Sequence, residues 1–198
     1  MKKIVFIVLF LFSVQALFAF DFGVKVGYNA SKLTTNLDSI KSQFKSGFHL
    51  GLFARIGGRL YFQPELLYTL QGGVFESNIN TNNWKEKVTI GSMDVPLLLG
   101  FRIINNDNLN LRIDAGPVAS FVVNKSVKEA GGVTGPITTA SINNVNWYIH
   151  AGAGVDLWFI TFDIRYQVGL NKLIQEVSTW DFNSSNNLWV ISLGFKIL

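Results

Sequence analysis

Residues 161–170 read TFDIRYQVGL, and this stretch decides the fold. Side chains of a β-strand point alternately to its two faces, so one face of this segment is apolar and the other carries Asp163 and Arg165. A water-soluble barrel encloses its apolar face, whereas a transmembrane barrel turns that face to lipid and encloses the polar one. The charged face is the one that must be enclosed here, which indicates a membrane strand. The apolar face consists of Phe162, Ile164, Tyr166, Val168 and Leu170.

The same alternation recurs along the chain after residue 20. It predicts strands at 21–30, 45–56, 59–72, 84–103, 109–122, 144–158, 161–171 and 187–197. Their connections alternate between short turns, at 57–58, 105–108 and 159–160, and long loops, at 31–44, 73–83, 123–143 and 172–186. An even strand number with short periplasmic turns and longer outer loops is the plan of outer-membrane barrels. We therefore predict an all-β fold, an eight-stranded antiparallel up-and-down transmembrane β-barrel.

The fourth predicted strand departs from simple alternation. Its upper residues Val88 and Ile90 share a face with Asp94 and Arg102. A β-bulge near Gly91 would account for the change of face. The alternative is that the upper half of this strand stands above the membrane.

The first 19 residues have the pattern of a secretory signal peptide. Lys2 and Lys3 form a positive n-region, an apolar run follows from Ile4 to Phe18, and Ala19 offers a small residue for cleavage. The run is shorter than the roughly 20 residues that a transmembrane helix needs. We expect a leader at 1–19 and one outer-membrane barrel domain at 20–198.

The composition excludes several classes of protein. The chain has no cysteine, so it lacks disulfides, thiolate metal sites and a cysteine nucleophile. Its net charge is +4, but Lys2 and Lys3 lie in the predicted leader, which leaves 15 Lys and Arg against 13 Asp and Glu, a net charge of +2. No basic cluster follows a helix or strand, so nucleic acid is not an expected partner.

The strand alternation collects many charged side chains inside the barrel. An eight-stranded barrel is only wide enough for its own side chains to fill, so these charges must pair. We expect a salt-bridged plug that is structural, with a narrow pore lined by the same residues as the alternative. The predicted lumen charges are Lys25, Arg55, Glu65, Arg102, Arg112, Asp114, Asp156, Asp163, Arg165 and Lys196.

Catalytic and metal sites have little support in the sequence. His49 and His150 both face inward by alternation, and Ser46, Ser92 or Ser120 could come near them, but no local nucleophile motif is present. Two histidines on non-adjacent strands do not make a metal-ligand set. No cofactor motif is found, so we expect no cofactor. A lipid-modifying enzyme acting at the barrel rim remains a third hypothesis.

The long loops are the remaining candidates for binding, because binding residues concentrate on loops carried by a rigid scaffold. Trp180 and Phe182 form an aromatic pair beyond the membrane band, either packed against the rim or contacting a partner. We expect the protein to contact outer-membrane lipid, the barrel-insertion machinery during biogenesis, and an envelope protein partner.

Several short stretches, in order along the chain, carry a resemblance to a known family. They are FGVKVGYNAS at 22–31, SGFHLGLF at 46–53, QPELLY at 63–68, DVPLLL at 94–99, AGP at 115–117, RY at 165–166 and GL at 169–170. In these the chain resembles the small outer-membrane β-barrel family of Bacteroidota-type bacteria, including PorT-like proteins. The resemblance implies a barrel in the outer membrane without implying one activity. A PorT-like protein would be accessory to protein export.

Overall fold

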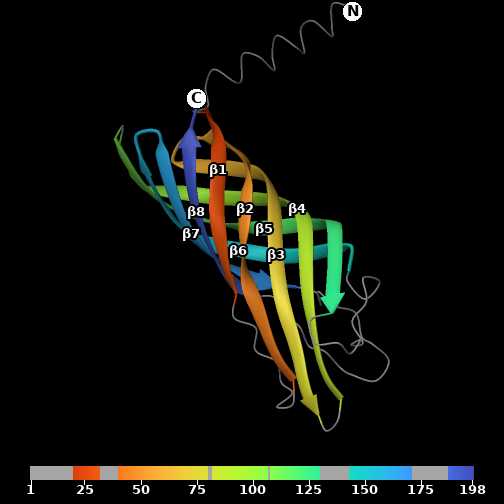
Figure 1. Cartoon of the computed structure of the whole chain (residues 1–198). Helices are drawn as coiled ribbons and strands as arrows, with labels where there is room; N and C mark the ends of the chain where they lie inside the picture. Colours follow the sequence, from red (N-terminus) through yellow and green to blue (C-terminus); the bar gives the residue numbers. More distant parts are fainter. Residues whose placement is uncertain (1–19, 32–39, 80–81, 107, 130–142, 171–186) are drawn as a thin grey trace, which may run out of the picture.

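A computed structural model describes residues 20–31, 40–79, 82–106, 108–129, 143–170 and 187–198. In these residues eight antiparallel strands form one closed barrel in chain order, with β1 paired to β8 (Figure 1). The predicted fold is confirmed. The strands are β1 (Phe20–Ser31), β2 (Ile40–Gly57), β3 (Leu60–Ile79), β4 (Asn82–Asn105), β5 (Leu109–Glu129), β6 (Val145–Leu157), β7 (Ile160–Gly169) and β8 (Leu188–Lys196).

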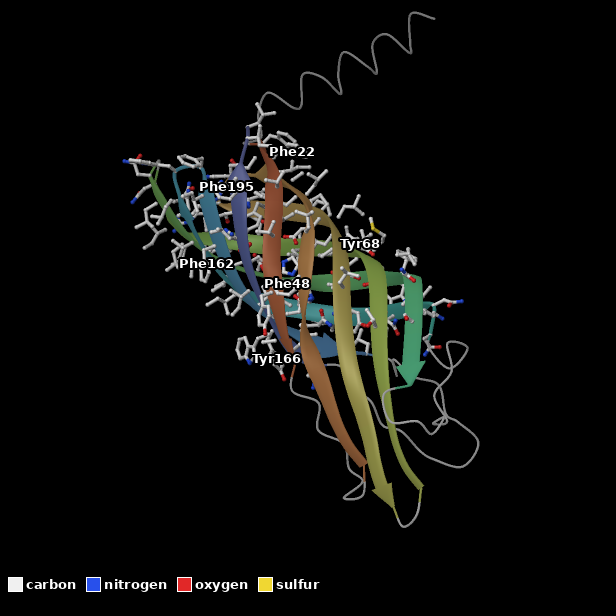
Figure 2. The ribbon with its side chains drawn as sticks, in the orientation of Figure 1. Phe22, Phe48, Tyr68, Phe162, Tyr166 and Phe195 are labelled. Carbon is white, nitrogen blue, oxygen red and sulfur yellow. The ribbon has the colours of Figure 1, made fainter. Side chains whose placement is uncertain are left out.

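Apolar side chains cover the outside of the barrel wall. In β7 and β8 buried and exposed residues alternate along the strand, and the exposed side chains are apolar. Figure 2 shows Phe22 and Phe195 toward the end that holds the termini and Tyr166 toward the opposite end. Aromatic rings at both ends of an apolar wall are typical of the two membrane interfaces. No helix in the described ranges has the length and apolar character needed to span a bilayer.

The strands are unequal in length, which corrects the predicted loops. The stretch 73–83 is not a long loop, because β3 and β4 pair continuously from Gly73↔Val88 to Ile79↔Asn82. In the same way β2 begins at Ile40 and β5 continues to Glu129, inside the stretches predicted as loops. These segments are rich in Asn, Ser and Lys, but their backbones complete a ladder with a neighbouring strand. Figure 1 shows this longer side of the barrel reaching beyond the shorter β1, β6, β7 and β8.

The short turns lie at the end of the barrel that holds both termini. The turn between β6 and β7 is formed by Trp158 and Phe159, not by 159–160 as predicted, and Trp158 adopts a φ of 52°. Gly57 ends β2 with a φ of 123°, a conformation that glycine adopts without steric cost. The chain ends meet here, since the amide of Phe22 donates to the carbonyl of Leu198 at 3.0 Å. By the outer-membrane plan this end faces the periplasm.

The predicted irregularity near Gly91 is present, but the extra residue lies in the neighbouring strand. The register shifts between Gly91↔Asn124 and Ser92↔Val122, so Val123 of β5 is unpaired. The alternation of β4 continues through this point, and Ile90 is buried inside the barrel. The reason is that a bulge shifts only the strand that contains the extra residue.

A charged lumen closed by ion pairs

The structure places the predicted charged set in the lumen. Nine of its ten members are buried, with at most 6 % of each residue exposed, and Lys196 is half-buried. Trp180 and Phe182 lie outside the described residues, so the predicted loop contact stays a prediction. The nine buried members are Lys25, Arg55, Glu65, Arg102, Arg112, Asp114, Asp156, Asp163 and Arg165.

Arg112 of β5 is the centre of the lumen network. Its Nη1 lies 3.0 Å from Oδ2 of Asp114 and its Nε lies 3.1 Å from Oδ1 of Asp156. Its Nη2 donates to Asp163 and also to the Thr161 hydroxyl at 2.6 Å. The guanidinium therefore uses its fork of donors on three carboxylates from three strands.

Arg165 and Lys25 extend the network toward Glu65. Nε of Arg165 lies 2.7 Å from Oδ1 of Asp114, and its Nη1 lies 3.0 Å from Oε1 of Glu65. Nζ of Lys25 lies 2.6 Å from the same Glu65 oxygen and 2.8 Å from Oδ2 of Asp163. One carboxylate of β3 thus serves a cation of β1 and a cation of β7 across the lumen.

Asp21 joins the network at the short-turn end, and the sequence analysis missed it. Its Oδ2 lies 3.0 Å from Nη2 of Arg102 and 3.3 Å from Nη1 of Arg55. Arg55 also pairs with Asp156 at 2.8 Å. The signal was available, because Asp21 shares the inward face of its strand with Lys25.

With Asp21 included, the ion pairs form one connected group of five cations and five carboxylates. The cations are Lys25, Arg55, Arg102, Arg112 and Arg165, and the carboxylates are Asp21, Glu65, Asp114, Asp156 and Asp163. Lys196 forms no ion pair with any residue that the structure describes. The equal numbers allow every buried charge to be neutralised inside the lumen.

Two aromatic rings alternate with three of these cations. The Phe53 ring centre lies 5.2 Å from Nζ of Lys25 and 5.7 Å from Cζ of Arg55. The Tyr61 ring centre lies 5.1 Å from Cζ of Arg55 and 5.5 Å from that of Arg102. Cation–π contacts of this kind hold like charges apart and strengthen when water is excluded. The column closes the short-turn half of the lumen.

The other half of the lumen is lined by buried apolar side chains as well as polar ones. On β3, β4, β5 and β6 these residues lie farther from the short turns than the ion-paired residues of the same strand. This apolar layer was not predicted, because only charged side chains were collected from the inward faces of the strands. It includes Leu67, Ile90, Leu98, Val118, Tyr148, Leu188 and Val190.

The two histidines are part of this inner packing. Nδ1 of His49 lies 2.9 Å from Oδ1 of Asn29 and its Nε2 lies 2.9 Å from Oγ of Ser192. The connectivity is that of a serine–histidine–asparagine triad, but Ser192 is only 2 % exposed, which keeps its hydroxyl from a substrate. The arrangement satisfies the hydrogen-bonding groups of a buried histidine.

Two of the three serines considered beside the histidines have another role, and the side chain of Ser46 lies outside the described side chains. Ser92 and Ser120 both donate to Asp94, and Nε2 of His150 lies 2.7 Å from Oε1 of Gln167. The described side chains include no group of three His, Cys, Asp or Glu arranged to hold a metal ion. The lumen therefore contains a neutralised ionic and hydrogen-bonded core.

Several known structures are similar in shape to this chain at low sequence identity. Ail, the attachment invasion locus protein of Yersinia pestis, solved with the heparin analogue sucrose octasulfate, is 15% identical with a TM-score of 0.46, over 90% of this chain and 99% of that one. LpxR from Salmonella typhimurium is 8% identical with a TM-score of 0.39, over 87% and 99%. The translocator domain of NalP from Neisseria meningitidis is 10% identical with a TM-score of 0.31, over 90% and 87%. We draw no functional argument from similarities this low.

The sequence itself matches a defined family. No curated protein matches the chain. The model of the outer membrane protein beta-barrel domain matches residues 15–175, most of the chain. This match agrees with the closed barrel, its apolar outer wall and its charged lumen. The chain belongs to the outer membrane protein beta-barrel domain family, and its place is the bacterial outer membrane.

Proposed function

We propose that this protein is a non-enzymatic outer-membrane barrel that works as an interaction protein through the part of the molecule beyond the membrane. The observation that carries the proposal is the ten-residue ionic network, which fills one half of the lumen with neutralised charge, while buried apolar and polar side chains line the other half. A barrel filled in this way is a rigid anchor and leaves its outer end as the functional surface.

The unequal strands support an interaction role. Beyond the wall, β2 pairs with β3 as far as Ile40↔Ser77, and β4 pairs with β5 as far as Glu86↔Glu129. The result is a four-stranded sheet that continues past the last described pairs of β1 and β6 with these strands, at Asn29↔Gly47 and Phe121↔Val145. We name it the outer sheet, made of 40–46, 72–79, 82–91 and 122–129. A sheet edge offers backbone groups to which an extended partner segment can add.

The kind of partner follows from the resemblance to PorT-like proteins. It favours an envelope protein of an export apparatus, to which this barrel would be accessory. Outer-membrane lipid and the barrel-insertion machinery are the contacts that any barrel of this type makes during its assembly.

The proposal also includes a leader at residues 1–19 that is cleaved, which leaves a mature barrel domain at 20–198. The start of β1 at Phe20 supports this boundary. Amino-terminal sequencing of the protein purified from outer membranes would begin near Phe20. A mature chain that still began at Met1 would contradict it.

Site-directed crosslinking in intact cells tests the interaction role. Because the chain has no cysteine, one thiol can be introduced at a time. Ser77→Cys places it in the outer sheet, and the matched control Asn106→Cys places it in a short turn at the opposite end. We expect the first variant to capture one stoichiometric envelope protein and the second to capture none.

A shortened variant separates anchoring from binding. Replacing residues 74–87 by an Asn-Gly turn joins Gly73 to Val88, which are paired in register. This variant should insert as a folded barrel and lose the partner. Capture from Asn106→Cys alone would overturn the proposal, and so would turnover of lipopolysaccharide or phospholipid by the purified barrel, which would favour a rim enzyme.

A further inference from the structure

Arg59 differs from the other four arginines of the chain. Those four point into the lumen and pair with carboxylates. Arg59 is exposed in the short turn between β2 and β3. Its Nε donates to the carbonyl of Arg102 at 3.3 Å, and its Cζ lies 5.3 Å from the centre of the Phe101 ring. Its two terminal amino groups have no hydrogen bond or ion pair with any residue in the described part of the chain.

An apolar groove of about 410 Å³ begins beside this arginine on the outer wall. Ala115 of β5 is paired in register with Ala151 of β6, and their small side chains leave a depression in the outer surface of the barrel. Larger side chains of β3, β4 and β5 flank them. The outward residues that line the groove are Leu60, Leu99, Phe101, Ile113, Ala115 and Ala151.

The groove and the arginine are joined at the periplasmic edge of the wall. Leu60 follows Arg59 directly and pairs with Phe101 at the first position of β3. The Phe101 ring contacts the guanidinium and also lines the groove. The positive charge of Arg59 therefore lies at the periplasmic edge of the wall. The apolar groove begins beside it and continues along the lipid-facing surface of the barrel.

We propose that Arg59 and this groove bind one anionic phospholipid of the periplasmic leaflet, with its phosphate on the guanidinium and an acyl chain along the groove. A guanidinium offers paired N–H donors that match phosphate oxygens, and it is weakly hydrated. A phospholipid with an anionic headgroup has a net negative charge that attracts Arg59. In a choline headgroup the quaternary ammonium group already neutralises the phosphate, so the attraction is weaker. The inference goes beyond the proposed interaction role and does not depend on it.

A second groove of about 390 Å³ on the same outer wall provides an internal control. Its outward lining is also apolar, and it includes Val26, Tyr28 and Ile191. Among the described residues no exposed cation lines it. It should accept acyl chains without a preference for the headgroup.

Native mass spectrometry of the folded mature chain tests the site. The protein is refolded in non-ionic detergent and offered phosphatidylglycerol and phosphatidylcholine in equal amounts. We expect retention of phosphatidylglycerol over phosphatidylcholine by about fivefold, which corresponds to roughly 1 kcal/mol for one arginine at an anionic surface. Arg59→Gln should bring the ratio to one, and Arg59→Lys should keep part of the preference.

Two further variants separate the groove from the cation. Ala115→Phe fills the groove and should lower retention of the anionic lipid, while Val26→Phe in the second groove should leave the ratio unchanged. Heat-modifiable migration on a gel verifies that each variant is folded. A wild-type ratio of one, a ratio unchanged in Arg59→Gln, or full retention in Ala115→Phe would each overturn the proposal.

Discussion

Each buried charge in the lumen depends on partners from other strands. Moving an ion out of water costs several kcal/mol, and pairing inside a protein only about offsets that cost. Arg112 offsets the cost of its burial by pairing with Asp114 at 3.0 Å and Asp156 at 3.1 Å, in addition to Asp163. A buried ion pair therefore adds little net stability, but removing one partner costs much more, because it leaves an uncompensated buried charge.

Glu65→Ala tests this asymmetry. The substitution removes the carboxylate that lies 2.6 Å from Lys25 and 3.0 Å from Arg165, and it leaves the five cations facing four carboxylates. We expect a loss of unfolding free energy on the order of 3 kcal/mol. Urea titration of the refolded barrel, followed by heat-modifiable migration, measures it.

The matched control is Arg59→Ala, which removes a charge without an ion pair in the described residues. Its unfolding free energy should change by less than about 0.5 kcal/mol. Equal midpoints for wild type and Glu65→Ala would mean that the charge network does not hold this part of the barrel together.

Alternation along each strand was sufficient to predict which charged side chains face the lumen, but not which of them pair. Lys25 and Glu65 are 40 positions apart, and His49 and Ser192 are 143 apart. Their meeting depends on the stagger of the strands, which alternation within one strand does not contain. Asp21 was overlooked for another reason, since it stands at the start of its strand, where boundaries are least certain.

At the scale of the strands, the number and order were predictable and the lengths were not. Asn-rich and Ser-rich composition was interpreted as loop at 73–83, yet the backbone pairs there as far as Ile79↔Asn82. Polar composition indicates that the side chains of a segment can face water. It does not decide whether the backbone forms a β-ladder, which depends on a neighbouring strand within hydrogen-bonding distance. The closing turn of that hairpin, at 80–81, lies outside the described residues.

Gly27→Ala tests how closely the strands pack around the lumen. A Cβ at this position would lie 2.3 Å from the carbonyl oxygen of Ile191 in β8 and 2.3 Å from the His49 ring of β2. The backbone of β8 and the buried His49 side chain would have to move, so we expect a destabilisation of about 1–3 kcal/mol. Thermal unfolding followed by the far-ultraviolet circular dichroism of the barrel measures it.

Gly58→Ala is the control for this substitution. A Cβ at Gly58 meets no atom within 4 Å, so its unfolding temperature should stay that of the wild type. Equal unfolding temperatures for Gly27→Ala and Gly58→Ala would show that the structure around His49 can accommodate an added methyl group without loss of stability.

At the scale of the whole molecule, two different layers close the same lumen. Nearest the short turns, Arg102, Tyr61, Arg55, Phe53 and Lys25 alternate as cation and ring. Beyond them lie buried apolar side chains. An ion crossing the barrel would have to displace the first layer and then pass tightly buried apolar and polar side chains in the second. Both layers must open for conduction, and this argues against the narrow-pore alternative.

Single-channel recording in a planar bilayer measures conduction directly. We expect the wild-type barrel to be silent, because its lumen charges are neutralised and buried. Arg112→Ala leaves Asp156 and Asp163 short of a partner, which should admit water and produce an irregular leak, and Glu65→Ala should do the same beside Lys25. Arg59→Ala, outside the lumen, should remain silent. A steady wild-type conductance that Arg112→Ala shifts to a new value would show that the charged lumen is a pathway, and the pore would then replace the anchored interaction protein as the function of this barrel.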